Sequence, residues 1–214
     1  MKRNYNIDFL KGIAAVFVVF IHVKFIGIVG DYIANIGTFA VPIFFITSGY
    51  FAKSVSNYKL KKKISHVIVL ILVAYVLNII RIIIEYRKQT IDYFFDNVFT
   101  VKHLILWVVF NNTQISGVAW FLWALLYCYI IHLILNKRIN RLRFVAWISI
   151  LSFACGIVLS VILPTIGISF TGTNNVWFCG LPYYLTGIII KIITDPTQTE
   201  NKQTNIHTYI HFQY

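Results

Sequence analysis

Charged residues are scarce in this sequence, and their scarcity excludes an ordinary soluble domain. They make up 12% of the 214 residues, whereas 58% of the residues are hydrophobic and the mean hydropathy is +0.75. A soluble domain carries about twice this charged share, because a surface that faces water needs it. We therefore expect lipid, in place of water, to surround most of the chain.

Acidic residues and cysteines are also few. Seven Asp and Glu stand against 19 Lys and Arg, which gives a net charge of +12. In a soluble protein this excess would suggest nucleic acid as a partner. The three cysteines lie in apolar runs without CxxC spacing, so we predict buried free thiols that form neither disulfides nor metal sites. A cleaved signal peptide is not expected, because Asp8 and Lys11 interrupt the first apolar run and further apolar runs follow.

Long apolar runs are abundant, and they predict a polytopic transmembrane helical bundle of the all-α class. A helix needs roughly 20 apolar residues to cross the hydrocarbon core of a bilayer. Six stretches approach this length: 7–28, 36–52, 64–84, 117–135, 144–163 and 177–193. They predict a transmembrane domain over residues 1–193. Residues 194–214 are polar and aperiodic, which predicts a disordered cytoplasmic tail.

The distribution of basic residues predicts that the N-terminus is cytoplasmic. With this orientation, 14 of the 19 Lys and Arg fall on the cytoplasmic side and 5 on the outer side. Such an asymmetry is typical of membrane proteins, so the positive charge requires no nucleic-acid partner. The segment from Val98 to Phe110 is apolar but has only 13 residues. It is too short to span, and we predict a re-entrant or interfacial helix there.

Ionisable residues within an apolar span are costly and therefore indicate candidate functional sites. His22 lies in the outer half of the first span, where it is either a hydrogen-bonded core residue or a general base. Lys11 precedes it by eleven residues, which at about 100° per residue places both on one helix face, about 16 Å apart along the axis. Lys11 is then either an anchor at the membrane surface or a partner for the anionic part of a long ligand.

Two further stretches carry the same ambiguity. In the second span, Pro42 predicts a kink, and Ser48 with Gly49 permits the close approach of another backbone or of a ligand. The run from Tyr58 to Lys63, YKLKKK, is either a topological anchor or a clamp for phosphates arriving from the cytoplasm.

These residues resemble the membrane-bound acyltransferase 3 family over about residues 5–193. The motif of a basic residue, ten residues and a His in the first helix is matched by Lys11 and His22, with Lys in place of the usual Arg. The family has an R-x-x-R motif that is implicated in acyl-CoA binding. Lys59 and Lys62 have the spacing of this motif, again with Lys in place of Arg. VPIFFITSGYF resembles the second-helix motif, and weaker similarities begin at Trp120 (WFL) and Leu181 (LPYYLTG).

The resemblance implies an enzyme that transfers an acyl group, usually acetyl, from acyl-CoA to a hydroxyl or amine of an envelope carbohydrate or lipid-linked precursor. We expect an O-acyltransferase of the bacterial plasma membrane, surrounded by membrane lipids, in which His22 is the general base. The expected donor-binding residues are Lys11, Lys59, Lys62 and Lys63. Ser48, an oxyanion donor or packing residue, and Trp120 are the expected pocket residues.

No residue spacing is typical of a metal site, a nucleotide-binding fold or a covalent acyl-enzyme, so no bound cofactor is expected. The acyl-CoA that the resemblance implies is expected as a co-substrate. Members of the family usually have about ten membrane helices, which suggests that this chain is an N-terminal portion or a truncated copy. The alternative is a non-catalytic membrane fragment or a transporter-like protein, in which His22 is a packed core residue.

Overall fold

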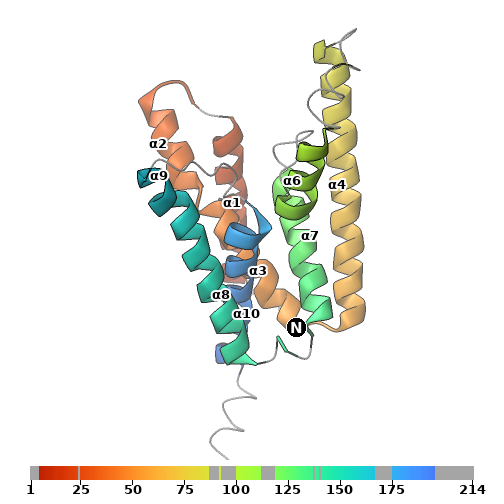
Figure 1. Ribbon diagram of the computed structural model, residues 1–214, viewed down its shortest axis with the longest axis vertical. Helices are drawn as coiled ribbons and strands as arrows, with labels where there is room; N and C mark the ends of the chain where they lie inside the picture. The colour runs from red at the N-terminus through yellow and green to blue at the C-terminus, as the bar shows by residue number, and fades with distance from the viewer. Residues whose placement is uncertain are drawn as a thin grey trace, which may run out of the picture.

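The computed structural model describes residues 5–23, 25–86, 92, 100–111, 119–136, 138–139, 141–166 and 175–195. Helices are the only regular secondary structure in these ranges, which confirms the predicted all-α class. In chain order they are α1 (Tyr5–His22), α2 (Ile28–Gly37), α3 (Ala40–Lys53), α4 (Asn57–Tyr86), α6 (Val101–Phe110), α7 (Ala119–Ile134), α8 (Leu142–Ile157), the π-helical turn η2 (Val158–Ile162), α9 (Leu163–Thr165), the π-helical turn η3 (Val176–Gly180) and α10 (Leu181–Thr194). Figure 1 shows α4, α6 and α7 beside a second group made of the other helices.

The lengths and surfaces of the helices are those of a multi-pass membrane protein. Within the described ranges, five stretches are long and apolar enough to cross a membrane: Tyr5–His22, Ile28–Lys53, Asn57–Glu85, Leu142–Thr165 and Val176–Thr194. A sixth apolar helix, α7, is shorter, with 16 residues. Large apolar side chains cover the outside of the bundle, and on α4 Leu72 and Leu77 are 58% and 62% exposed. Such a surface requires lipid around it.

The first two predicted spans differ from the structure in their boundaries. α1 ends at His22, six residues before the predicted end of the span. The chain then turns through Gly27, whose φ of 91° is favourable for glycine, and α2 begins at Ile28. The second apolar stretch therefore consists of α2 and α3 and is longer than predicted. Beyond Asp195, the predicted tail lies outside the described residues.

Pro42 acts between two helices and does not kink the middle of one. It is the third residue of α3, and α2 ends five residues before it. A proline ring clashes with the carbonyl group four residues earlier, which here belongs to Thr38. Thr38 is the residue at which α2 stops, and its hydroxyl donates to the Asn35 carbonyl at 2.7 Å. The predicted kink is thus a break between α2 and α3.

α3 and α10 form the closest helix pair, because glycines allow their backbones to meet. A Cβ atom on Gly49 of α3 would collide with the carbonyl oxygen of Tyr184. A Cβ atom on Gly187 of α10 would likewise collide with the carbonyl oxygen of Ile46. Of the two possibilities for Ser48 and Gly49, the structure thus shows the approach of another backbone at Gly49. This contact fixes the position of α10, which contributes to both parts of the site described below.

α6 is a short helix that packs on α7 and η3. Its ten residues extend for about 15 Å, which is too short to span a bilayer, as predicted for this segment. Asn111, at its end, donates to the carbonyl of Trp120 at 2.8 Å and accepts from the backbone N–H of Val176 at 2.6 Å. This one amide therefore joins α6 to the beginnings of α7 and η3, where residues of the candidate site lie.

The cysteines are only partly as predicted. Cys128, Cys155 and Cys179 are free thiols, but only Cys128 is buried. Cys155 is exposed because it lies on the outer side of α8, and Cys179 is half-buried because η3 turns it toward a cavity. The prediction of three buried thiols is wrong for these two.

The arrangement of helix ends allows a direct test of the predicted topology. Asn136, after α7, donates to Asn57, the first residue of α4, at 3.0 Å, so these ends lie together (Figure 1). In a background without native cysteines, Ile166→Cys should react with an impermeant thiol reagent added to intact cells. Ser56→Cys and Arg141→Cys should react only after permeabilisation. External labelling of Arg141→Cys would overturn the six-span topology.

Candidate active site

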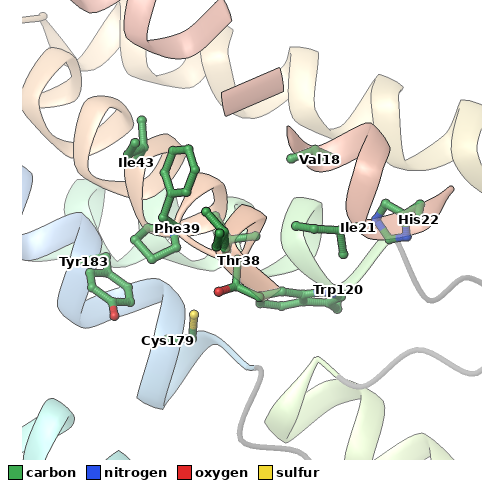
Figure 2. Close-up of a pocket in the computed structure, with 12 residues that line it drawn as sticks. Val18, Ile21, His22, Thr38, Phe39, Ile43, Trp120, Cys179 and Tyr183 are labelled. Atoms are coloured by element: carbon green, nitrogen blue, oxygen red, sulfur yellow. The ribbon is translucent and has the colours of Figure 1, made fainter. Parts of the chain in front are cut away.

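A cavity of about 690 Å³ lies among α1, α2, α3, α7, η3 and α10. Figure 2 shows His22 of α1 at its edge, with Trp120, Cys179 and Tyr183 contributed by the other helices. These residues come from the last turn of α1, the first turn of α7 and the η3–α10 segment. They therefore lie in the half of the bundle away from the basic helix ends, which is the outer half in the predicted topology.

His22 is accessible and lacks a protein partner within the described part of the chain. Its side chain is exposed, lines the cavity and makes no hydrogen bond to any described residue. His132 of α7 provides a contrast, because it is buried and its Nδ1 lies 2.8 Å from the Tyr184 hydroxyl. His132 thus has the environment of a hydrogen-bonded core histidine, whereas His22 has that of a side chain available to a ligand.

The local structure of the chain after Asn175 places Cys179 and Tyr183 in the cavity wall. Asn175 begins η3 by accepting hydrogen bonds from the backbone N–H groups of Trp177 and Phe178, at 2.8 and 3.1 Å. The wide π-helical turn then changes the rotation of the chain before α10 begins at Leu181. Neither Cys179 nor Tyr183 was predicted to be a pocket residue. A five-residue π-helical turn has no strong sequence signal, so their orientation could not be predicted.

The two residues expected in a pocket, Trp120 and Ser48, lie in different places. Trp120 lines the cavity together with His22. Ser48 is not among the residues that line it, and its hydroxyl hydrogen-bonds with Tyr129 of α7. The structure thus shows a helix-packing contact for Ser48, and its role as an oxyanion donor stays a prediction.

One face of α1 connects this cavity to the basic end of the bundle. Lys11, Ala14, Val18 and His22 lie at helical spacing along it. Ala14 is fully buried, Val18 and His22 line the cavity, and the Lys11 ammonium lies 4.5 Å from the ring centroid of Phe51 on α3. The predicted shared face of Lys11 and His22 is therefore the face that packs on α3.

The lysines of α4 differ in where they point. Lys63 is half-buried, and its ammonium lies 5.9 Å from the ring centroid of Tyr129 on α7. It is also within electrostatic range of Lys11. Lys59 and Lys62 are exposed. Of the three lysines predicted here, only Lys63 is directed into the bundle beside Lys11.

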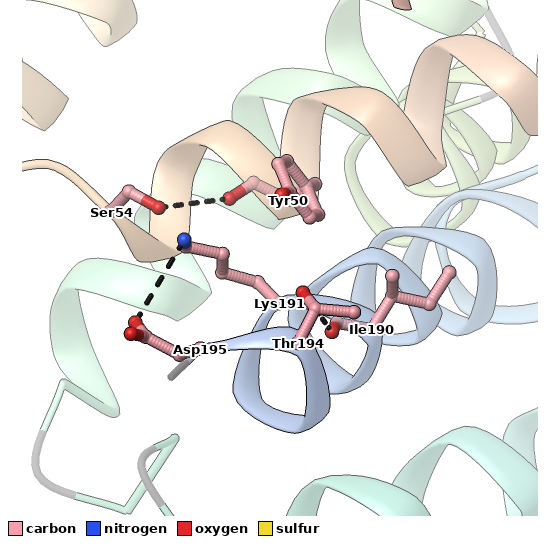
Figure 3. A network of polar contacts seen from close by, with 6 residues as sticks. All are labelled: Tyr50, Ser54, Ile190, Lys191, Thr194 and Asp195. Atoms are coloured by element: carbon pink, nitrogen blue, oxygen red, sulfur yellow. Dashed lines mark hydrogen bonds and ion pairs between the residues drawn. The ribbon is translucent and has the colours of Figure 1, made fainter. Parts of the chain in front are cut away.

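Two lysines that the sequence did not single out as donor-binding residues lie at the same end. Figure 3 shows Lys191 of α10, whose ammonium lies near the end of α3 and 3.8 Å from the carboxylate of Asp195. The ammonium is also 5.4 Å from the ring centroid of Tyr50. Lys53, the last residue of α3, is half-buried and within electrostatic range of both Lys191 and Asp195. Because these residues are far apart in sequence, only the α3–α10 packing reveals that they converge.

The two ends of this arrangement differ in their chemistry. One end offers an imidazole in a cavity and the other offers ammonium groups, with a continuous helix face between them. Among the described residues no cluster of three His, Cys, Asp or Glu side chains has the geometry of a metal site. The protein's own groups can accept a proton at the His22 end and bind an anion at the lysine end.

Comparison with protein families assigns the chain to a family. The model of the acyltransferase 3 family, described as an acyltransferase domain, matches residues 4–205. This match covers nearly the whole chain, and the protein belongs to this family of membrane acyltransferases. Comparisons with curated proteins and with solved structures gave no significant match.

Proposed function

We propose that the protein is an integral membrane O-acyltransferase of the plasma membrane that moves an acetyl group from acetyl-CoA to a hydroxyl of a cell-envelope carbohydrate or its lipid-linked precursor. The observation that carries this proposal is the single α1 face with Lys11 at its cytoplasmic end and the accessible His22 in the outer cavity. Eleven residues of helix separate them by about 16 Å, a distance on the scale of an extended pantetheine arm.

The donor binds with its phosphates at the lysines and its thioester toward the cavity. Lys11 and Lys63 contact the phosphates, because both ammonium groups are directed into the bundle. Lys62, next to Lys63, and Lys59, one turn before it, are exposed and strengthen the positive field that attracts the anionic donor from the cytoplasm. The Lys ammonium is a point charge, whereas the planar guanidinium of Arg can bind a phosphate through two parallel hydrogen bonds. Several lysines therefore replace the bidentate contacts that arginines would make.

His22 then performs general base catalysis on the acceptor. The imidazole removes the proton of the acceptor hydroxyl as its oxygen attacks the thioester carbonyl carbon. The tetrahedral intermediate collapses with cleavage of the carbon–sulfur bond, which yields the acetyl ester and the CoA thiolate. The imidazolium returns the proton to the thiolate, so the enzyme ends in its starting state. Trp120 and Tyr183, in the cavity wall, provide aromatic surfaces suited to an acceptor sugar.

Removal of the α4 lysines should weaken donor binding. We expect Lys59→Gln, Lys62→Gln and Lys63→Gln together to cost a few kcal/mol of acetyl-CoA binding free energy, because each charge-assisted hydrogen bond contributes about 1.5–3 kcal/mol but the cytoplasmic mouth is partly screened by salt. Most of the loss should be reproduced by Lys63→Gln alone, since only Lys63 is directed inward. Equilibrium binding of labelled acetyl-CoA to the purified protein at low salt would measure it. Unchanged affinity of the triple variant would reduce these lysines to determinants of topology.

A further inference from the structure

The lysines at the cytoplasmic end form two pairs, and one member of each pair lies over an aromatic ring of α3. Consecutive aromatic residues of α3, Tyr50 and Phe51, have nearly perpendicular rings, 5.4 Å apart. The ammonium of Lys11 lies over the Phe51 ring, and it is within electrostatic range of Lys63. The ammonium of Lys191 lies over the Tyr50 ring, and it is within electrostatic range of Lys53, which is one turn after Tyr50 on α3. One pair thus belongs to α1 and α4, and the other to α3 and α10.

The second pair is not explained by topology or by helix dipoles alone. Lys53 and Lys191 are half-buried and within electrostatic range of each other, although lysines at a helix C-terminus can point into water and still interact favourably with the dipole. Two like charges that are partly removed from water repel one another. Asp8 acts on Lys11, and Asp195 acts on Lys53 and Lys191. The described residues therefore place four ammonium groups against two carboxylates, an arrangement that favours an anionic ligand.

The position of each pair relative to α1 distinguishes their ligands. In coenzyme A, the pyrophosphate is joined directly to pantetheine, and the 3′-phosphate lies one nucleoside farther away. Pantetheine that follows the α1 face toward His22 leaves the pyrophosphate beside Lys11 and Lys63. The 3′-phosphate then falls to the pair that is farther from this face, Lys53 and Lys191.

We propose that Lys53 and Lys191 bind the 3′-phosphate of the donor and so allow the enzyme to distinguish coenzyme A from its 3′-dephospho form. This proposal rests on the proposed function, because it assigns a subsite of the same donor. When the 3′-phosphate binds, Lys191 exchanges the Asp195 carboxylate, 3.8 Å away, for a dianionic phosphate. Asp195 therefore holds Lys191 in place while the subsite is empty.

The test is a comparison of coenzyme A and 3′-dephospho-coenzyme A as ligands of the purified protein in lipid nanodiscs. The unaltered protein should bind coenzyme A about 10-fold or more tightly than the dephospho form, as expected for one charge-assisted phosphate contact. The double variant Lys53→Gln, Lys191→Gln should lose this preference, with coenzyme A weakened by about 10-fold and the dephospho form unchanged. Retained affinity for the dephospho form also shows that the variant is folded.

Two matched double variants serve as controls, since each removes the same number of positive charges. Lys11→Gln with Lys63→Gln should weaken both ligands equally, because the pyrophosphate is common to them. Arg141→Gln with Arg143→Gln, at exposed positions before and within α8, should change neither. Equal weakening of both ligands by the Lys53 and Lys191 substitutions, or no effect on either, would overturn the proposal.

Two other results would also overturn it in distinguishable ways. If the unaltered protein binds neither ligand, the proposed donor is wrong, and the proposed 3′-phosphate subsite is wrong as well. If the lysines instead hold the phosphate of an anionic lipid, substitution of Lys53 and Lys191 should release phosphatidylglycerol, detected by native mass spectrometry. In that case the affinity for coenzyme A should remain unchanged in nanodiscs of phosphatidylcholine alone.

Discussion

Replacement of His22 by Gln is expected to lower turnover by about 10²- to 10⁴-fold, the usual contribution of a positioned general base. Gln keeps a polar side chain of similar reach but cannot accept the acceptor's proton, so the substitution separates basicity from packing. The affinity for acetyl-CoA should remain nearly intact, because His22 lies about 16 Å along α1 from Lys11. Acyl transfer per mole of folded protein, with donor affinity measured in parallel, is the required measurement.

The environment of His22 supports this expectation over a structural role. A core histidine would be buried and hydrogen-bonded, as His132 is with Tyr184, and its replacement by Ala would reduce stability while Gln was tolerated. His22 is exposed at the cavity and has no partner among the described residues. His66→Gln is a suitable control, because His66 is an exposed histidine on α4 whose Nδ1 pairs with the carbonyl of Lys62. This control should keep its turnover.

Replacement of Gly49 by Ala is expected to destabilise the fold by about 3 kcal/mol, at the upper end of the usual range for overpacking. The added methyl group would meet the backbone carbonyl of Tyr184, which cannot rotate away as a flexible side chain can. α3 and α10 would have to separate, and both the cavity and the lysine pairs depend on their contact. A fall in the midpoint of thermal unfolding, followed by intrinsic tryptophan fluorescence in detergent, would report this loss.

Gly12 offers a matched control for the same substitution. A Cβ atom at Gly12 would meet nothing within 4 Å, and Ala has a higher helix propensity than Gly by about 1 kcal/mol. Gly12→Ala should therefore leave the unfolding midpoint unchanged or raise it slightly. Equal midpoints for the two variants would contradict the close α3–α10 contact.

The sequence was sufficient to predict features that depend on local periodicity. Apolar runs near 20 residues predicted the helices, and the spacing of Lys11 and His22 predicted their shared face, because helix geometry alone relates them. The break before α3 was predicted only in part. Pro42 marked an irregularity, but its position relative to Thr38 became clear only when the start of α2 at Ile28 was known.

Features that depend on tertiary contacts could not be predicted in the same way. His132 lies in an apolar run of α7, and its partner Tyr184 is 52 residues away on α10. The pairing of Lys53 with Lys191 similarly requires that Gly49 and Gly187 bring two helix backbones together. Basic residues at helix ends look alike in a sequence, whether they point outward, as Lys59 does, or inward, as Lys63 does.

The most direct test of acyl transfer by His22 is to follow acetyl-CoA consumption in sealed vesicles that contain the oriented protein. Acetyl-CoA with a labelled acetyl group is supplied on the side of the lysines, and an envelope carbohydrate fraction is supplied on the opposite side. We expect release of free CoA thiol in step with the appearance of alkali-labile label on the carbohydrate, and loss of both with His22→Gln. Passage of intact acetyl-CoA across the membrane without thiol release, or full transfer by His22→Gln, would contradict the proposed acyl transfer.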